Sequence, residues 1–113
     1  MGNINSYRDL IVWQKSMNLV TEIYASTKLF PSEELYGLTS QIRRSAVSIP
    51  SNIAEGYARN STGDYRRFLH IAAGSIFELL TQIEIASNLK YLTIEILKAL
   101  FNATNEIELL LLA

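Results

Sequence analysis

The residues best suited to chemistry lie between positions 43 and 67, where arginines outnumber acids. The arginines are Arg43, Arg44, Arg59, Arg66 and Arg67. Glu55 and Asp64 oppose them, so five cations meet two anions and the local balance is +3 in a chain of net charge −1. Repeated guanidinium groups bind a phosphate backbone without reading its base sequence. The pattern predicts one basic surface for nucleic acid, and pairing with acids of a neighbouring subunit is the alternative.

Reactive groups for catalysis are sparse. His70 is the single histidine and the chain contains no cysteine, which excludes thiol chemistry and metal centres that need two histidines. Glu55 has no second acid placed for general acid-base work, so we expect it to pair with Arg44, Arg59 or a neighbouring subunit. No glycine-rich phosphate loop is present. We therefore expect no enzymatic activity, no metal and no cofactor.

Apolar residues recur at three- and four-residue spacing along the whole chain, which predicts helices and no strands. The first helix is expected from about Tyr7 to Lys28, and the second from an N-cap at Ser32 to about residues 57–59. Ser61 is expected to cap the third helix and Thr93 the fourth. Short connections make neighbouring helices antiparallel, so residues 1–113 are predicted to form one domain, an all-α, up-down-up-down four-helix bundle.

The large apolar residues of the first helix predict its core face. They form one stripe of Leu10, Trp13, Met17, Val20 and Tyr24. We expect Trp13 to lie in the core or in an interface, and a stacking platform for nucleic-acid bases is the alternative.

The second helix contains Pro50, which costs about 3 kcal/mol in a helix interior and predicts a kink or a break there. Its core face is predicted to hold Ile42, Ser45, Ile49, Ile53 and Gly56. Beside that face lies a second apolar strip, wider than one core requires: Ala46, Val47, Pro50, Ala54 and Tyr57. Asn52 is expected to be a polar residue that fixes register or a subunit contact, and Gly74 in the third helix a site of close backbone approach. This surplus predicts homo-oligomerisation, and a merely apolar surface on a shortened chain is the alternative.

The composition is 49% hydrophobic and 19% charged, yet no continuous apolar run reaches about 18 residues. The N-terminal residues also lack the basic and apolar regions of a signal peptide. We expect a cytoplasmic protein that does not associate with membranes.

Several motifs together resemble a known family. They are the segment VWQK at 12–15, the pair FP at 30–31, the run LTSQIRRSAVSIPSNIAEG at 38–56, and FLHIAAGSIFE at 68–78. In essentially its whole length the chain resembles the bacterial 23S rRNA-intervening sequence proteins. The resemblance implies a four-helix bundle, usually a ring-like homopentamer, with no established catalysis. Related accessory proteins of diversity-generating retroelements share the bundle and the pentamer, are strongly basic, and bind nucleic acid and a reverse transcriptase.

Two hypotheses of function follow from the residues and the resemblance. The first is a non-enzymatic homo-oligomer, a pentamer by resemblance, that binds RNA or an RNA-protein complex through its arginines. The alternative is a protein-interaction scaffold that binds no nucleic acid and docks partners on its apolar strips.

Overall fold

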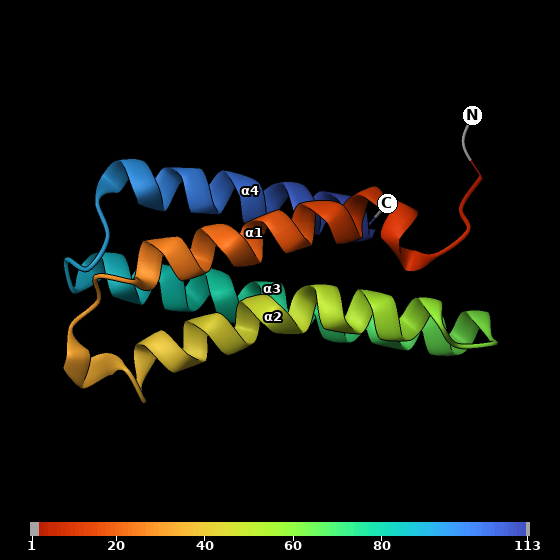
Figure 1. The fold of residues 1–113 in the computed structure, drawn as a ribbon, viewed down its shortest axis with the longest axis horizontal. Coiled ribbons are helices and arrows are strands. Elements are labelled where there is room, and N and C mark those ends of the chain that lie inside the picture. Colours follow the sequence, from red (N-terminus) through yellow and green to blue (C-terminus); the bar gives the residue numbers. More distant parts are fainter. Residues whose placement is uncertain (1–2, 113) are drawn as a thin grey trace.

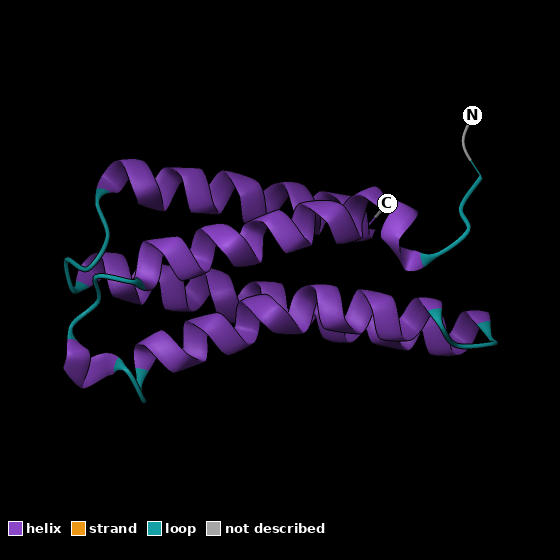
Figure 2. Cartoon of the chain, in the orientation of Figure 1, coloured by secondary structure: helices purple, strands orange, loops and turns teal. Residues whose placement is uncertain are grey.

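The computed structural model describes residues 3–112, and within them every regular element is a helix. The α-helices are α1 (Ile11–Thr27), α2 (Leu38–Tyr57), α3 (Thr62–Asn88) and α4 (Ile94–Leu112). Two short 3-10 helices, η1 (Tyr7–Asp9) and η2 (Ser32–Glu34), precede α1 and α2. Successive helices run in opposite directions along the bundle (Figure 1), and the loops between them lie at its ends (Figure 2). Both α2 and α4 pack against α1 and α3, which confirms the predicted all-α four-helix bundle.

Branched aliphatic side chains fill the centre of the bundle. On α2, Ile42, Ile49 and Ile53 are at most 1% exposed, as the predicted core face requires. They share one core cluster with residues of the other helices, among them Leu19, Ile23, Ile76, Leu79, Ile83, Leu100 and Ile107. Each such side chain contributes about 1.5–3 kcal/mol relative to leaving it in water.

Helix α1 turns a different face to the core than its large apolar residues predict. Its buried residues are Ser16, Leu19, Ile23 and Thr27. Met17 and Tyr24 are each 43% exposed, whereas the other three residues of the predicted stripe are partly buried against the core, so the stripe faces the core only in part. The hydroxyls of Ser16 and Thr27 donate to backbone carbonyls four residues earlier, at 2.7 and 2.8 Å, which satisfies both groups inside the bundle. Leu19 and Ile23 consequently face the core, whereas Met17 and Tyr24 lie toward the surface.

Helix α2 begins at Leu38, and the N-cap predicted at Ser32 is wrong. Ser32 opens η2, and Gly37 then breaks the helical path with φ −112° and ψ −114°. The carboxylate of Glu34 accepts a hydrogen bond from the backbone N–H of Leu38 at 3.2 Å, so an acid from the preceding turn caps α2. A Cβ at Gly37 would lie 2.9 Å from Glu34 Oε1, so a larger residue there would displace the capping carboxylate.

Helix α2 continues through Pro50 without a break. Its axis changes direction near the middle of the helix (Figure 1). Proline has no N–H for the carbonyl of Ala46, and its ring displaces that carbonyl, which accounts for the bend. Of the two predicted alternatives, the structure has the kinked helix.

The other two predicted caps are confirmed. The hydroxyl of Ser61 accepts from the backbone N–H of Asp64 at 3.1 Å, where α3 begins. The hydroxyl of Thr93 accepts from the backbone N–H of Ile96 at 3.2 Å, where α4 begins. These local signals fix both helix starts because each capping group and its donor lie within one turn.

Glu34 also ties the α1–α2 connection to the α3–α4 loop. Tyr91 donates its phenol O–H to Glu34 Oε2 at 3.0 Å, and this bond raises the pKa of Tyr91 above its ordinary value of 10.0. The folded state therefore holds this proton more tightly than the unfolded chain. The resulting stability is fully present below pH 10.0 and is lost as the pH rises through the raised pKa of Tyr91.

We expect Tyr91→Phe to flatten the loss of stability above pH 10, measured by urea unfolding followed by circular dichroism at several alkaline pH values. Tyr36→Phe is the matched control, because the Tyr36 side chain is 93% exposed. Identical alkaline slopes in the wild type and Tyr91→Phe would contradict the proposed role of the Glu34 hydrogen bond.

By length and composition, α3 is the one helix in the described part of the chain that is apolar enough to cross a membrane. The sequence predicts no membrane-spanning segment there, because no continuous apolar run in α3 is long enough. One helix of this kind is weak evidence, since the core helix of a soluble protein passes the same test. In the bundle α3 supplies Ala72, Ile76, Leu79 and Ile83 to the core.

Candidate functional site

The five arginines lie in two groups. Arg43 and Arg44 are near the start of α2, whereas Arg59, Arg66 and Arg67 lie around the turn from α2 to α3. At 1.5 Å per residue, about 22 Å of chain rise separates Arg44 from Arg59. The arginines therefore do not form one cluster in the single chain, because the length of α2 separates the two groups.

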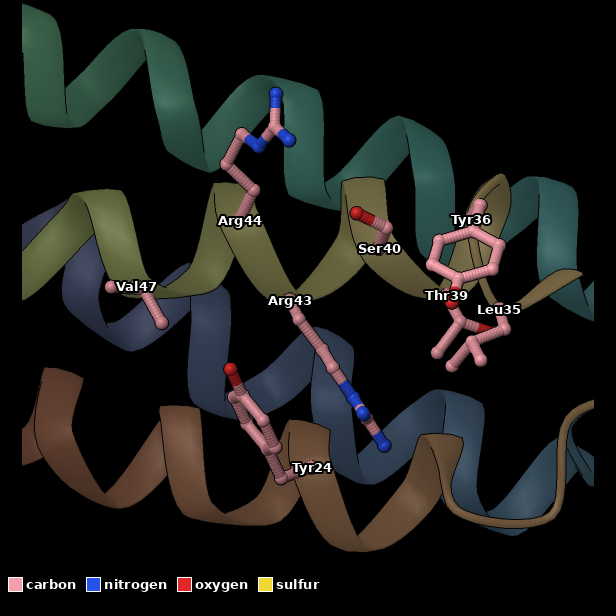
Figure 3. Close-up of a pocket in the computed structure, with 8 residues that line it drawn as sticks. All are labelled: Tyr24, Leu35, Tyr36, Thr39, Ser40, Arg43, Arg44 and Val47. Atoms are coloured by element: carbon pink, nitrogen blue, oxygen red, sulfur yellow. The ribbon is translucent and has the colours of Figure 1, made fainter.

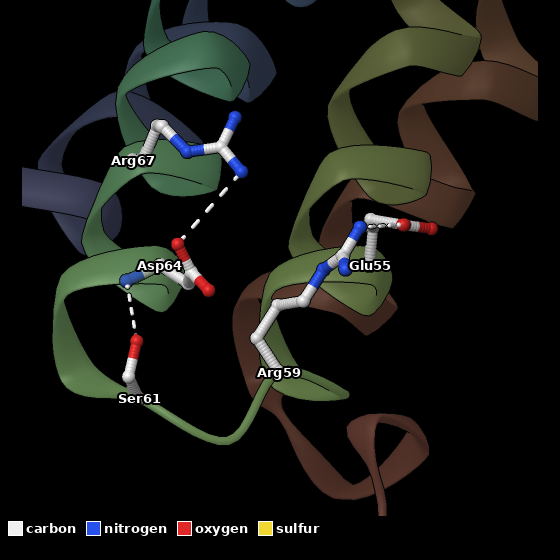
Figure 4. A network of polar contacts seen from close by, with 5 residues as sticks. All are labelled: Glu55, Arg59, Ser61, Asp64 and Arg67. Carbon is white, nitrogen blue, oxygen red and sulfur yellow. Dashed lines mark hydrogen bonds and ion pairs between the residues drawn. The ribbon is translucent and has the colours of Figure 1, made fainter.

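The group at the α2–α3 turn is partly balanced by acids (Figure 4). Arg59 Nη2 lies 2.6 Å from Glu55 Oε1, and Arg67 Nη2 lies 3.9 Å from Asp64 Oδ1. Both pairs are exposed, so each is worth at most about 0.5 kcal/mol. Among the described residues, Arg66 has no carboxylate within 4.0 Å. Glu55 is thus engaged by Arg59, one of the three partners expected for it.

The ring of Phe68 contacts two of the arginines at the α2–α3 turn. The guanidinium carbons of Arg59 and Arg67 lie 4.9 and 4.5 Å from the centroid of its ring. Cation–π contacts of this kind hold planar guanidinium groups in place while leaving their N–H groups available. The α2–α3 connection therefore presents two oriented cations, Arg59 from the turn and Arg67 from α3.

Arg43 occupies a different setting, in a surface pocket of about 450 Å³ between α1 and α2. Figure 3 shows its side chain reaching from α2 toward Tyr24 on α1, whereas Arg44 extends to the other side of α2. Arg43 Nε donates to Thr27 Oγ1 at 2.9 Å, and its guanidinium carbon lies 4.5 Å from the centroid of the Tyr24 ring. We call this the Arg43 pocket; its lining is Tyr24, Leu35, Tyr36, Thr39, Ser40, Arg43, Arg44 and Val47.

An apolar groove continues from the Arg43 pocket along the same pair of helices. Val47 lines both. The α1–α2 groove has a volume of about 320 Å³ and is lined by Tyr7, Trp13, Met17, Val20, Val47, Pro50, Ser51 and Ala54. Met17 and Val47 are 43% and 39% exposed, so the groove is open to solvent in the single chain. Trp13 lies half-buried in its wall, packed against the edge of the core.

Asn52 belongs to a polar network between α2 and α3. Its Nδ2 donates to the carbonyl of Ser48 at 2.8 Å and to Ser48 Oγ at 2.9 Å. The hydroxyls of Ser48 and Ser75 lie 2.8 Å apart, and Ser75 donates to the carbonyl of Ile71 at 3.2 Å. Asn52 is half-buried. Asn52 itself bonds only within α2, and the Ser48–Ser75 contact joins α2 to α3 beside the kink.

The other residues predicted for an interface lie in different environments. Ala46 is 0% exposed, which places it in the core and not on a subunit surface. Pro50 and Ala54 line the α1–α2 groove. Tyr57 is half-buried and meets Tyr65 edge-on, with ring centroids 6.4 Å apart. Burial, and then the nearby Tyr57, raise the pKa of Tyr65.

Gly74 and Gly56 differ in how closely other parts of the chain approach them. A Cβ at Gly74 would meet nothing within 4 Å, so no backbone approaches it closely in the single chain. A Cβ at Gly56 would lie 2.8 Å from Phe68 Cβ and 3.3 Å from the carbonyl oxygen of Tyr65. Gly56, which the sequence places on the core face of α2, is thus a site where this helix and α3 approach closely.

Sequence reasoning missed the polar surroundings of Arg43. Thr39 is 4% exposed, lines the pocket, and its Oγ1 has no hydrogen-bond partner. Thr27 and Tyr24 come from α1, a separate helix. No local motif signals these contacts, since they depend on how α1 packs against α2.

Groups for metal or acid-base chemistry do not gather elsewhere in residues 3–112. No three His, Cys, Asp or Glu side chains are placed there to hold a metal ion. His70 is exposed on α3. The arrangement thus offers ordered cations and apolar grooves.

Comparisons with known proteins agree with the fold and the motifs. The profile of the 23S rRNA-intervening sequence protein family matches residues 8–113. A crystal structure from Bacteroides thetaiotaomicron VPI-5482, described as a protein with unknown function from the S23 ribosomal protein family, is similar at 28% identity with a TM-score of 0.82. The match covers 89% of this chain and 94% of that one. No curated protein matches at a significant level. The profile match over nearly the whole chain shows that this protein belongs to the 23S rRNA-intervening sequence protein family.

Proposed function

We propose that this protein is a non-enzymatic bundle that associates with copies of itself and acts as a multivalent binding platform. The observation that carries the proposal is the exposure of large apolar side chains on two separate faces. One face is the α1–α2 groove, with Met17 and Val47 exposed. The other is on α3, where Phe77 is 54% exposed and Ile71 and Ile85 are each 43% exposed. Apolar patches of this kind mark interaction surfaces.

The number of subunits in the proposal comes from the resemblance, which implies a ring of five. The scarcity of reactive side chains supports a binding role. Light scattering on the purified protein tests the self-association. A mass of several times 12.7 kDa supports it, and a mass of 12.7 kDa at micromolar concentration contradicts it.

RNA binding at the α2–α3 turn is the second candidate function. Arg66 has no acidic partner among the described residues, and Arg59 and Arg67 are oriented by Phe68. In an oligomer this small cation cluster is repeated in every subunit. Repetition supports binding to a phosphate backbone without sequence preference.

We expect Arg66→Glu to weaken RNA binding and to reduce the slope of log K against log salt by at least about 1. Fluorescence anisotropy with a labelled single-stranded RNA measures both quantities. Lys98→Glu, an exposed site on α4, is the control that changes the net charge equally. RNA binding that is absent, independent of salt, or equal in the two variants would contradict this function and leave the protein-scaffold role.

A further inference from the structure

Arg43 is a half-buried cation without a counter-ion. Among the described residues no carboxylate lies within 4.0 Å of its guanidinium group. Its hydrogen bond is to the neutral hydroxyl of Thr27, and the bond uses Nε and leaves the two terminal nitrogens without a protein acceptor. Partly buried charges are normally paired, so the Arg43 pocket has the chemistry of an anion site.

Apolar side chains flank Arg43 in its pocket. Leu35, Tyr36 and Val47 offer an apolar wall for a hydrophobic group that lies beside an anion bound to Arg43.

The chain carries a matching group on α3. Glu78 is exposed, and no cation lies within 4.0 Å of it in the part of the chain that the structure describes. Phe77 beside it is 54% exposed. With these two, the α3 strip comprises Ile71, Gly74, Phe77, Glu78 and Ile85, which fall within about a third of the helix circumference at 100° per residue.

We propose that the Arg43 pocket of one copy binds Glu78 from the α3 strip of a second copy, with Phe77 against the apolar wall. This inference rests on the proposed self-association and names the two surfaces that meet. It gives the Arg43 guanidinium its counter-ion. The half-buried Arg43 and the exposed Glu78 are opposite charges without a partner among the described residues, and exposed apolar groups flank each of them. This charge complementarity favours a second copy as the occupant.

The spacing along the two surfaces is compatible with this pairing. Pro50, in the α1–α2 groove, is one heptad from Arg43 on α2, and both Ile71 and Ile85 are one heptad from Glu78 on α3. Each separation corresponds to about 10 Å of helix. When Glu78 lies at Arg43, an isoleucine of the α3 strip therefore reaches the groove, and Gly74, with nothing within 4 Å, leaves room for a close helix approach.

Each copy carries both surfaces. Contacts repeated in one direction from copy to copy produce a closed ring or an open filament, and reciprocal contacts between two copies produce a two-fold dimer. The ring that the resemblance implies is one of these outcomes.

Charge reversal tests the pairing. We expect Arg43→Glu and Glu78→Arg each to weaken self-association by at least about tenfold, and the double variant Arg43→Glu/Glu78→Arg to recover most of it. Sedimentation velocity over a dilution series measures the association. Glu22→Arg is the control, because Glu22 faces the side of α1 that is next to α4. Circular dichroism monitors folding, and Glu78→Arg keeps the test valid if Arg43→Glu unfolds, since Glu78 is exposed.

The outcomes separate this inference from the proposed self-association. A wild-type monomer overturns both. A wild-type oligomer that Glu78→Arg leaves intact overturns the inference alone. Loss in both single variants without recovery in a folded double variant also overturns the pairing of these two residues. Loss in the single variants with recovery in the double variant supports it.

Discussion

Replacing Gly56 by alanine is expected to lower the free energy of unfolding by about 1–3 kcal/mol. The added Cβ would lie 2.8 Å from Phe68 Cβ, 3.0 Å from Tyr65 Cδ1 and 3.3 Å from the Tyr65 carbonyl oxygen. The Tyr65 ring is able to rotate, but the other two atoms move only with the backbone of α3. The helices must therefore separate near the end of α2, and this cost exceeds the gain of up to about 1 kcal/mol in helix propensity.

Urea unfolding at one fixed protein concentration measures this effect, because association would otherwise shift the midpoint. Gly63→Ala is the matched control, since a Cβ at Gly63 would meet nothing within 4 Å. We expect that control to stay within about 0.5 kcal/mol of the wild type or to gain stability. A Gly56→Ala variant as stable as the wild type would show that the α2–α3 contact is looser than described.

Replacing Val47 by glutamate is expected to dissociate the oligomer. Val47 lies where the Arg43 pocket and the α1–α2 groove meet. Its side chain is 39% exposed in the single chain, so the fold tolerates the change at a cost of about 0.5–1 kcal/mol. In an assembled interface the same carboxylate would be desolvated among Trp13, Met17 and Pro50, which costs at least about 3 kcal/mol, or a factor of about 100 in the dissociation constant.

Gln41→Glu is the control for this variant. It adds one negative charge to an exposed position on the same helix, outside both the Arg43 pocket and the α1–α2 groove. We expect Gln41→Glu to keep the wild-type mass in size-exclusion chromatography with light scattering. Equal masses for Val47→Glu and the wild type, with both folded, would place the interface elsewhere.

The core face of α2 was predictable because the sequence there satisfies helix spacing with branched aliphatic residues. With Ile42, Ile49 and Ile53 in the core, α2 has only one orientation in the bundle. The starts of α3 and α4 were predictable because the Ser61 and Thr93 caps are local signals. The face of α1 was not predictable, because apolar residues lie on two of its sides. The hydroxyls of Ser16 and Thr27 donate to the backbone of their own helix, so these polar residues are satisfied inside the bundle.

The sequence pattern also did not predict the start of α2 or the Arg43 pocket. An acidic residue such as Glu34 is typical of a first helical turn. The backbone at Gly37 is not helical, however, so α2 starts later and the Glu34 carboxylate caps it by accepting from the Leu38 N–H. Arg43 meets Thr27 across 16 positions of sequence. That contact exists only because α1 and α2 pack side by side, and so the division of the arginines into two groups follows from the fold.

The measurement that tests the central claim most directly is the mass of the native protein by light scattering, in a dilution series beside Val47→Glu. We predict a wild-type mass of several times 12.7 kDa that persists on dilution, and a folded Val47→Glu variant close to 12.7 kDa. A wild-type mass of 12.7 kDa over the whole series would contradict self-association through these apolar faces.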